Sequence, residues 1–333
     1  MSREKMEVQR RTLISALGLG AATVATAATA RIAGPRAFPA LSGSLTNAKT
    51  EYKTQRVGEV DVFYRVAGPE DAPVILLLHG FPTSGHMFRD LIPALADRYR
   101  VIAPDLPGFG QTQAPRRAAF DYSFANLAKV IEGLVDAIGL TRYALYIFDY
   151  GAPTGLRLAM ARPERVTAIV TQNGNAYIEG LSELWGPWQA YWRDPTPEHR
   201  EATRDSLSDD AIRFQYEHGA QAGLVAPDGY TLDTFYMHRP EAQEIQLDLI
   251  LSYRTNVALY PEFQAYFRKH RPPVLAVWGK NDPFFLPQGA VAYRRDNPDA
   301  EVHLLDAGHF ALETHHQEIA SIMRDFLGRK ISS

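Results

Sequence analysis

The chain has 333 residues and a net charge of −3, with 46% hydrophobic and 22% charged residues. This is the composition of a globular protein, with room for one large domain or a domain plus an insertion. No basic excess points to nucleic acid as a partner, and no like-charge block suggests an interaction arm. The absence of cysteine excludes disulfides, cysteine-bound metals and a thiol nucleophile.

The first 30 residues differ in character from the rest. A charged start with the pair Arg10-Arg11 is followed by uncharged residues from Leu13 to Ala30. This pattern resembles a twin-arginine export signal that is cleaved after Ala30. We therefore expect residues 1–30 to be an export signal, residues 31–50 a linker, and the protein to be periplasmic or secreted. The alternative is an uncleaved anchor helix or an extension without a fixed fold.

Short apolar runs alternate with helical patterns in the mature chain. Alternating residues on both sides of Gly58-Glu59 predict a hairpin. Helical spacing predicts helices at residues 86–99 and 123–140, with Ser123 as the N-cap of the second. Buried strands are predicted from two runs, PVILLLHG (73–80) and RVIAPDLPGFG (100–110). Further strands are predicted from YALYIFD (143–149), VTAIVTQNG (166–174), PPVLAVWGKND (272–282) and AEVHLLDAGH (300–309). This alternation predicts an α/β fold with a mostly parallel, doubly wound sheet.

The alternation stops between residues 176 and 262. That stretch has helical and loop patterns but no apolar strand run. We interpret it as a helical cap over the carboxyl ends of the strands, where open α/β sheets bind their ligands. The predicted α/β core therefore comprises residues 51–175 and 263–333. The Phe, Trp and Leu content of the cap predicts a mostly apolar pocket.

Polar residues follow four of the predicted strands. The sequence HGFP (79–82) follows the first of them, and Asp149, Asp282 and His309 follow later ones. Nucleophile, acid and histidine occur in this chain order in the α/β-hydrolase triad. HGFP, APDLPGFGQT, DYG, GKNDPFF and DAGHF all stand where the α/β-hydrolase fold has its motifs. With an aspartate at the strand–helix turn, the chain resembles the epoxide hydrolases and haloalkane dehalogenases.

The resemblance implies a hydrolase in which Asp149 attacks an electrophilic sp³ carbon and becomes esterified. His309, oriented by Asp282, then activates the water that hydrolyses the ester. The backbone N–H groups of Phe81 and Tyr150 are expected to form the oxyanion hole. The expected partners are a small apolar electrophilic substrate and water, with no metal, no organic cofactor and no stable membrane association once the signal is removed.

An epoxide leaving group would become an alkoxide and would need an acid. Epoxide hydrolases supply it from two cap tyrosines, and LSYRTN (251–256) resembles the second of their motifs. Tyr253 is therefore the first candidate. Tyr191 is the candidate for its partner, with Tyr177 and Tyr236 as alternatives. All of these tyrosines could instead be packing residues with hydrogen-bonded hydroxyls.

A halide leaving group would need N–H donors instead. Trp188, with Trp185 and Trp192 as alternatives, could supply one. However, Tyr150 stands where both families usually have tryptophan, and Phe81 where haloalkane dehalogenases often have a polar residue. We predict epoxide hydrolysis to a vicinal diol, with hydrolytic cleavage of a carbon–halogen bond as the alternative.

Two further interpretations carry less weight. Asp149 could be only the N-cap of the following helix, in a non-catalytic protein that binds a small apolar ligand under the cap. The presence of Asp282 and His309 in triad order argues against this. A carboxylesterase is the other interpretation. It would require Asp149 to attack an acyl carbon and form an anhydride, which argues against it.

Overall fold

The computed structural model describes residues 49–331, so the predicted export signal and nearly all of the predicted linker lie outside the described residues. The described residues belong to one compact unit. Within this part of the chain, no helix is both long enough and apolar enough to span a membrane.

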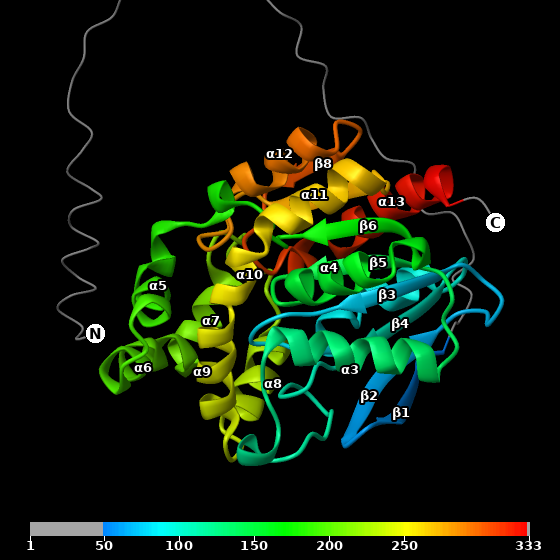
Figure 1. Cartoon of the computed structure of the whole chain (residues 1–333). Helices are drawn as coiled ribbons and strands as arrows, with labels where there is room; N and C mark the ends of the chain where they lie inside the picture. Colours follow the sequence, from blue (N-terminus) through cyan, green and yellow to red (C-terminus); the bar gives the residue numbers. More distant parts are fainter. Residues whose placement is uncertain (1–48, 332–333) are drawn as a thin grey trace, which may run out of the picture. The chain divides into compact units, whose positions relative to one another are not determined.

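The strands form one eight-stranded sheet in the order β1-β2-β4-β3-β5-β6-β7-β8. The β1–β2 and β2–β4 pairs are antiparallel, and every other neighbouring pair is parallel. The predicted mostly parallel sheet is confirmed, and Figure 1 shows its strands among the helices. The strands are β1 (Glu51–Val57), β2 (Val60–Ala67), β3 (Val74–Leu78), β4 (Arg100–Pro104), β5 (Tyr143–Phe148), β6 (Val166–Gln172), β7 (Val274–Gly279) and β8 (Glu301–Leu305).

Burial follows the composition of the strands. Every residue of β5 is buried, as expected for an apolar strand covered on both faces. β1 is largely exposed and joins β2 through Gly58-Glu59, where Gly58 has a φ of 55°. That left-handed conformation suits glycine, which has no Cβ. The predicted hairpin is confirmed and forms one edge of the sheet.

Helices cover both faces of the sheet (Figure 1). α2 and α13 pack together on one face, and α3 and α4 on the other. The predicted N-cap of α3 is confirmed, because the Ser123 hydroxyl accepts a hydrogen bond from the backbone N–H of Asn126. These helices and their neighbours are α2 (Leu91–Leu95), α3 (Phe124–Ala137), α4 (Gly151–Ala161), α11 (Tyr260–His270), α12 (Pro287–Asp296) and α13 (Ala311–Lys330).

The helix predicted at residues 86–99 is wrong in its length. The structure has a 3-10 turn, η1 (Gly85–Phe88), followed by the short helix α2. Pro93 explains the difference, because proline has no N–H to donate to the carbonyl of Arg89. A continuous helix through this segment would leave that carbonyl unpaired.

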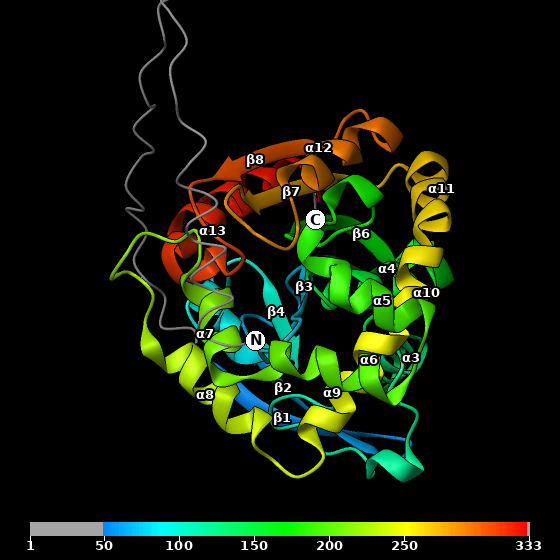
Figure 2. The same cartoon turned by 90° about the vertical axis from the view of Figure 1, so that its left-hand side faces the viewer.

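A helical segment lies between β6 and β7, where the sequence lacks a strand pattern. Figure 2 shows α5 to α9 gathered on one side of the sheet. The predicted cap boundary at residue 262 falls within α11, which packs against α4 and α12, so the domain limits stay a prediction. The cap elements are η4 (Ile178–Gly180), η5 (Glu183–Trp185), α5 (Gly186–Arg193), α6 (Pro197–Thr203), η6 (Arg204–Leu207), α7 (Asp209–Glu217), α8 (Pro227–Met237), α9 (Ala242–Ser252) and α10 (Arg254–Ala258).

Candidate active site

Asp149 occupies the sharp turn between β5 and α4. Its φ of 46° is left-handed, a conformation that non-glycine residues adopt at a cost and mostly at functional sites. Gly80 faces the carboxylate so closely that a Cβ there would lie 2.2 Å from Asp149 Oδ1. The side chain is nonetheless 6% exposed, so the turn presents a carboxylate that is almost enclosed.

Two backbone N–H groups hold this carboxylate. The N–H of Phe81 donates to Asp149 Oδ1 at 2.6 Å, and the N–H of Tyr150 also bonds to the Asp149 carboxylate. These are the two donors predicted for an oxyanion hole, and the structure brings both to the predicted nucleophile. Donors fixed in this way can stabilise a negative charge that develops on the oxygen they bind.

His309 and Asp282 lie together at the carboxyl edge of the sheet. The Nδ1 atom of His309 is 2.7 Å from Asp282 Oδ2, and both side chains are buried. Asp282 Oδ1 accepts a hydrogen bond from the N–H of Phe284 at 2.7 Å. The carboxylate is therefore fixed, and it orients the imidazole so that Nε2 is left for chemistry.

Asn173, at the end of β6, fixes the same carboxylate from the other side. Its Nδ2 donates to Asp282 Oδ2 at 2.7 Å, while its Oδ1 accepts from the N–H of Gly279 at 3.0 Å. Asn173 also has a left-handed φ of 45°. Sequence reasoning missed this positioning role. The signal that could have found it is the position of Asn173 directly after β6.

Burial and charge shift the pKa values of both predicted catalytic groups. Burial raises the pKa of Asp149 to about 6, although the nearby His309 and the two backbone N–H groups oppose this shift. Burial favours neutral His309, but Asp282 and Asp149 outweigh it and raise the pKa of the imidazole. Each group therefore favours the charged state of the other, which is the expected behaviour of an interacting acid–base pair.

His79 supports the loop that carries Phe81. Its Nε2 accepts a hydrogen bond from the N–H of Leu106 at 2.9 Å, so its proton lies on Nδ1, which donates to the carbonyl of Gly80 at 3.0 Å. Burial lowers the pKa of His79 to about 4. A neutral imidazole therefore joins two loops, and it has no free nitrogen for catalysis.

Tyr253 lies in the aromatic wall beside Asp149. Its ring is 5.7 Å from the ring of Tyr150 and 4.8 Å from that of Trp185. The hydroxyls of Tyr150 and Tyr253 are both buried. The Tyr253 hydroxyl interacts with that of Tyr260, which accepts a hydrogen bond from Asn175 at 3.2 Å. Burial raises the pKa of both phenols well above 10, and Asp149 adds to both shifts. Both hydroxyls therefore keep their protons at neutral pH.

The three cap tryptophans differ in what their indole N–H groups bind. Trp185 donates to the carbonyl of Phe284 and Trp192 to that of Ile250. The indole N–H of Trp188 has no hydrogen bond within residues 49–331, and its ring lies edge-on to Phe81 at 6.4 Å. Of the three, Trp188 is the one with a donor left for a ligand.

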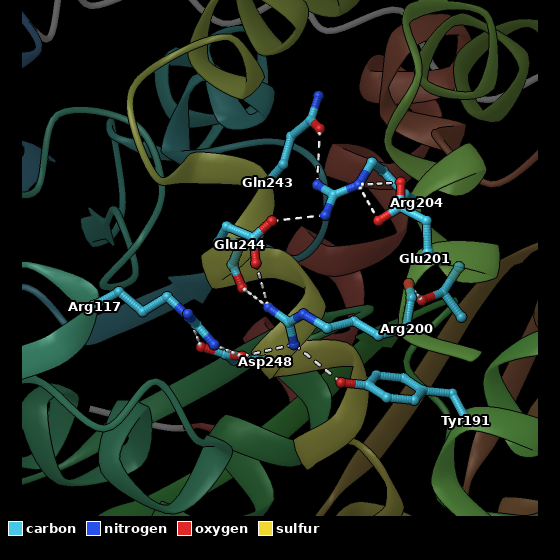
Figure 3. A network of polar contacts seen from close by, with 9 residues as sticks. Arg117, Tyr191, Arg200, Glu201, Arg204, Gln243, Glu244 and Asp248 are labelled. Carbon is cyan, nitrogen blue, oxygen red and sulfur yellow. Dashed lines mark hydrogen bonds and ion pairs between the residues drawn. The ribbon is translucent and has the colours of Figure 1, made fainter. Parts of the chain in front are cut away.

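Tyr191 is placed differently from what the sequence predicted. Its hydroxyl accepts a hydrogen bond from Arg200 at 3.0 Å, and Arg200 in turn binds Glu244 and Asp248 (Figure 3). The structure therefore places this hydroxyl in a salt-bridge network and not with Tyr253.

The two alternatives to Tyr191 also lie elsewhere. Tyr177 packs on Tyr293, with the guanidinium of Arg295 over its ring. Tyr236 accepts a hydrogen bond from Gln111 at 2.8 Å. Neither has a ring contact or hydrogen bond with the predicted triad.

No group of three or more His, Asp or Glu side chains in the described part of the chain could hold a metal ion. The adjacent residues His315 and His316 lie at a kink in α13 and outside the site.

Comparison with known proteins identifies the family. The family model described as alpha/beta hydrolase fold matches residues 73–316. An uncharacterized hydrolase of Saccharomyces cerevisiae is 47% identical over 274 residues, which cover 81% of this chain and 94% of that protein. Haloalkane dehalogenase 2 of Mycobacterium tuberculosis is 30% identical over 261 residues, covering 77% of this chain and 88% of its own.

Solved structures agree on the fold. The haloalkane dehalogenase DbeA of Bradyrhizobium elkani superposes with a TM-score of 0.67 at 22% identity, covering 84% of this chain and 100% of that one. A candidate epoxide hydrolase of Pseudomonas aeruginosa gives 0.70 at 19% identity, covering 84% and 96%. The expected fold is thus confirmed, and the chain belongs to the alpha/beta hydrolase family and is a hydrolase.

Proposed function

We propose that this hydrolase opens a small apolar epoxide through an ester at Asp149 and releases a vicinal diol. The observation that carries the proposal is the combination of a buried carboxylate at Asp149 with the protonated hydroxyl of Tyr253, whose ring contacts that of Tyr150. Opening an epoxide requires both, because the carbon must be attacked while the departing oxygen takes up a proton.

In the first step, the Asp149 oxygen that is not bonded to the N–H of Phe81 attacks a ring carbon, and the carbon–oxygen bond of the epoxide breaks. The Oδ1 atom stays on the N–H of Phe81. The departing alkoxide takes the proton of Tyr253, and the second buried hydroxyl, that of Tyr150, can donate to the same oxygen. The products of this step are the Asp149 ester and a tyrosinate, which recovers its proton from water.

In the second step, Nε2 of His309 removes a proton from a water molecule, which attacks the carbonyl carbon of the ester. The negative charge then lies on Oδ1, between the N–H groups of Phe81 and Tyr150. The bond between the carbonyl carbon and the ester oxygen breaks, and the diol leaves with the proton from His309. Asp282 stabilises the transient imidazolium.

A haloalkane is the second candidate substrate. Relatives named haloalkane dehalogenases and the free indole N–H of Trp188 favour it. The buried tyrosine hydroxyls favour the epoxide, because a halide leaves without taking up a proton. Non-catalytic ligand binding ranks below both, since binding alone would not need His309 fixed against Asp282.

We also propose that the protein is exported. The pair Arg10-Arg11 and the small residues that end at Ala30 support a twin-arginine signal with cleavage after Ala30.

The test is intact-protein mass spectrometry of His309→Gln after incubation with a terminal aryl epoxide or a bromoalkane. We expect a mass gain equal to the whole epoxide, located on the Asp149 peptide, because the ester forms but is not hydrolysed. Adding Tyr253→Phe should slow that mass gain about 10²–10⁴-fold, the usual contribution of a positioned acid.

Two other results would change the proposal. A mass gain equal to the alkyl group without bromine, seen with the bromoalkane alone, would favour the dehalogenase. Full turnover by folded His309→Gln, or an adduct that persists in Asp149→Asn, would show that the proposed roles are wrong.

A further inference from the structure

Asp233, in α8 of the cap, is a buried carboxyl group that the proposed chemistry does not use. It is 0% exposed. Its Oδ2 accepts a hydrogen bond from the hydroxyl of Tyr216 at 2.6 Å, and its Oδ1 has no partner in good geometry. Burial raises the pKa of Asp233 to about 7, against the opposing effects of the Tyr216 and Thr83 hydroxyls. A polar group buried at such a cost needs an explanation.

Tyr216 connects this carboxyl to the loop that carries the catalytic histidine. Its ring stacks on that of Phe310, with the two centroids 3.8 Å apart and the ring planes 9° from parallel. Phe310 directly follows His309, and their rings are 5.2 Å apart. Because the hydrogen bond to Asp233 fixes the far end of the Tyr216 ring, it also limits where the His309 loop can lie.

The same part of the cap touches the triad loops at two more points. A Cβ on Gly308 would lie 1.9 Å from the carbonyl oxygen of His218, so cap backbone and histidine loop are in direct contact. Asn281, next to Asp282, donates its side-chain N–H to the carbonyl of Gly219 at 3.0 Å. Figure 2 shows α7 and α8 on the side of the cap nearest α13.

We call this contact the histidine seam. It comprises Tyr216, His218, Gly219 and Asp233 from the cap, and Thr83, Asn281, Gly308 and Phe310 from the core. The charged groups that face Asp233 across it are Arg89 and Glu313, which bind each other through two hydrogen bonds of 3.0 and 2.7 Å. Since each of these ions has a partner, neither needs Asp233 as a counter-ion.

We propose that Asp233 and Tyr216 are positioning residues that hold His309 for the hydrolysis step. The inference rests on the proposed function. Attack by Asp149 does not need His309 in a fixed place, whereas the water must lie between His309 and the ester carbon. Loss of the seam should therefore slow hydrolysis of the ester and spare its formation. A merely structural role would slow both.

The experiment is single-turnover mass spectrometry with a terminal aryl epoxide. We expect Tyr216→Ala and Asp233→Ala to slow hydrolysis about 10–10²-fold while ester formation changes less than about threefold, so that the ester accumulates. Tyr216→Phe keeps the ring stack but loses the hydrogen bond to Asp233, so it should slow hydrolysis as Asp233→Ala does. Asp233→Asn keeps an acceptor for the Tyr216 hydroxyl and should recover most of the hydrolysis rate. Equal slowing of the two steps, or no slowing of either, would overturn the proposal.

The control variants are Tyr122→Phe and Asp296→Asn. Tyr122 is a buried tyrosine that bonds to the carbonyl of Pro115, and Asp296 is a buried carboxylate paired with Arg268. Neither belongs to the histidine seam. Both variants should keep the two rates of the unaltered protein, which shows that the loss of a buried hydroxyl or carboxylate does not by itself separate the steps.

A second measurement does not depend on the substrate. The proton on Nδ1 of His309, bonded to Asp282, should give a far-downfield NMR resonance. We expect it to be broadened or lost in Tyr216→Ala and Asp233→Ala and retained in both controls. An unchanged resonance would overturn the positioning role. If His309→Gln traps no ester but this resonance responds as expected, the proposed function fails while the positioning of His309 stands.

Discussion

Two of the contacts between the cap and the core have opposite character. The histidine seam is buried and rests on a ring stack, a backbone contact and a carboxyl group without a counter-ion. On the other side, Arg117 of the core joins Asp248 of α9 through two hydrogen bonds, and Arg200 binds the same Asp248 (Figure 3). The side chain of Arg117 is 42% exposed. We call this second contact the salt-bridge seam.

The difference bears on what each seam positions. The histidine seam touches the loop of His309, where a small displacement would misplace a water molecule. The salt-bridge seam holds α9, which ends at Ser252 immediately before Tyr253. Surface ion pairs are weak and tolerate several geometries. The contact beside the proposed base is therefore buried, and the ion pairs on the helix that leads to the proposed acid are partly exposed.

The largest expected effect comes from breaking the histidine seam with Gly308→Ala. The added Cβ would collide with the carbonyl of His218, and the backbone must move. We expect the free energy of unfolding to fall by about 1–3 kcal/mol and the hydrolysis rate by about 10²-fold. Urea unfolding and single-turnover kinetics measure these changes.

Gly186→Ala is the matched control in the cap. Gly186 has a φ of −49°, and an added Cβ would meet no atom within 4 Å. That variant should be neutral or more stable by up to about 1 kcal/mol. If Gly308→Ala is as active as Gly186→Ala, the histidine seam can accept the added Cβ without displacing His309. The two seams would then not differ in how they affect hydrolysis.

A change in stability of similar size and opposite sign is expected at Asp149, whose charge interacts with both His309 and Tyr253. Its pKa rises from 3.8 in the unfolded chain to about 6 in the fold, so ionisation favours the unfolded state as pH rises from about 4 to about 6. Asp149→Asn lacks this cost. It should be more stable by about 1–3 kcal/mol at pH 8, with the difference vanishing near pH 4.

Thermal or urea unfolding of both proteins across this pH range is the measurement. Asp149→Asn made in the Gly308→Ala protein should raise the free energy of unfolding by less than it does in the unaltered protein. The reason is that a displaced histidine seam admits water to the Asp149 carboxylate. An equal gain in both backgrounds would mean that the seam does not contribute to the burial of Asp149.

The smallest effect is expected from the salt-bridge seam. Arg117→Ala should lower the free energy of unfolding by about 0.2–1 kcal/mol, and 1 M salt should remove most of the difference by screening. Ester formation should change about twofold and hydrolysis not at all, since Tyr253 and not His309 adjoins this seam.

Arg329→Ala is the matched control. Arg329 lies at the end of α13 and is likewise an exposed arginine that binds two carboxylates, those of Glu301 and Asp325. It should leave both catalytic steps unchanged. An effect of Arg117→Ala on hydrolysis as large as that of Gly308→Ala would contradict the division of roles between the seams.

The sequence predicted the site residues whose positions depend only on the strands that precede them. Asp149 and Asp282 follow buried strands and His309 follows the edge strand β8, and parallel strands bring their carboxyl ends to one edge. The donors Phe81 and Tyr150 follow from the same turns. For these residues, position along the chain is nearly enough to place the side chain in space, because the sheet fixes both ends of each strand.

The cap tyrosines could not be placed in this way. Tyr191 and Tyr253 both lie in or beside amphipathic helices, and both are buried. Which hydroxyl turns toward Asp149 depends on how those helices pack, and Arg200 binds one of them. The partnership of Tyr216 with Asp233 joins two helices across a loop, so no spacing rule could reveal it. Asn173 directly follows β6, so its place at the site could be predicted, but the sequence does not show that its amide binds Asp282.

The hydrogen bond from Phe81 to Asp149 Oδ1 also decides the fate of individual atoms. Under the proposed chemistry, the held oxygen remains with the enzyme and the other one forms the ester. When water attacks the carbonyl carbon, the ester oxygen leaves in the diol and an oxygen from water takes its place. The oxygen held by Phe81 would then stay in the protein through every turnover. The other carboxylate oxygen would be replaced by an oxygen from water each time, so the reaction would change the atoms of its own nucleophile.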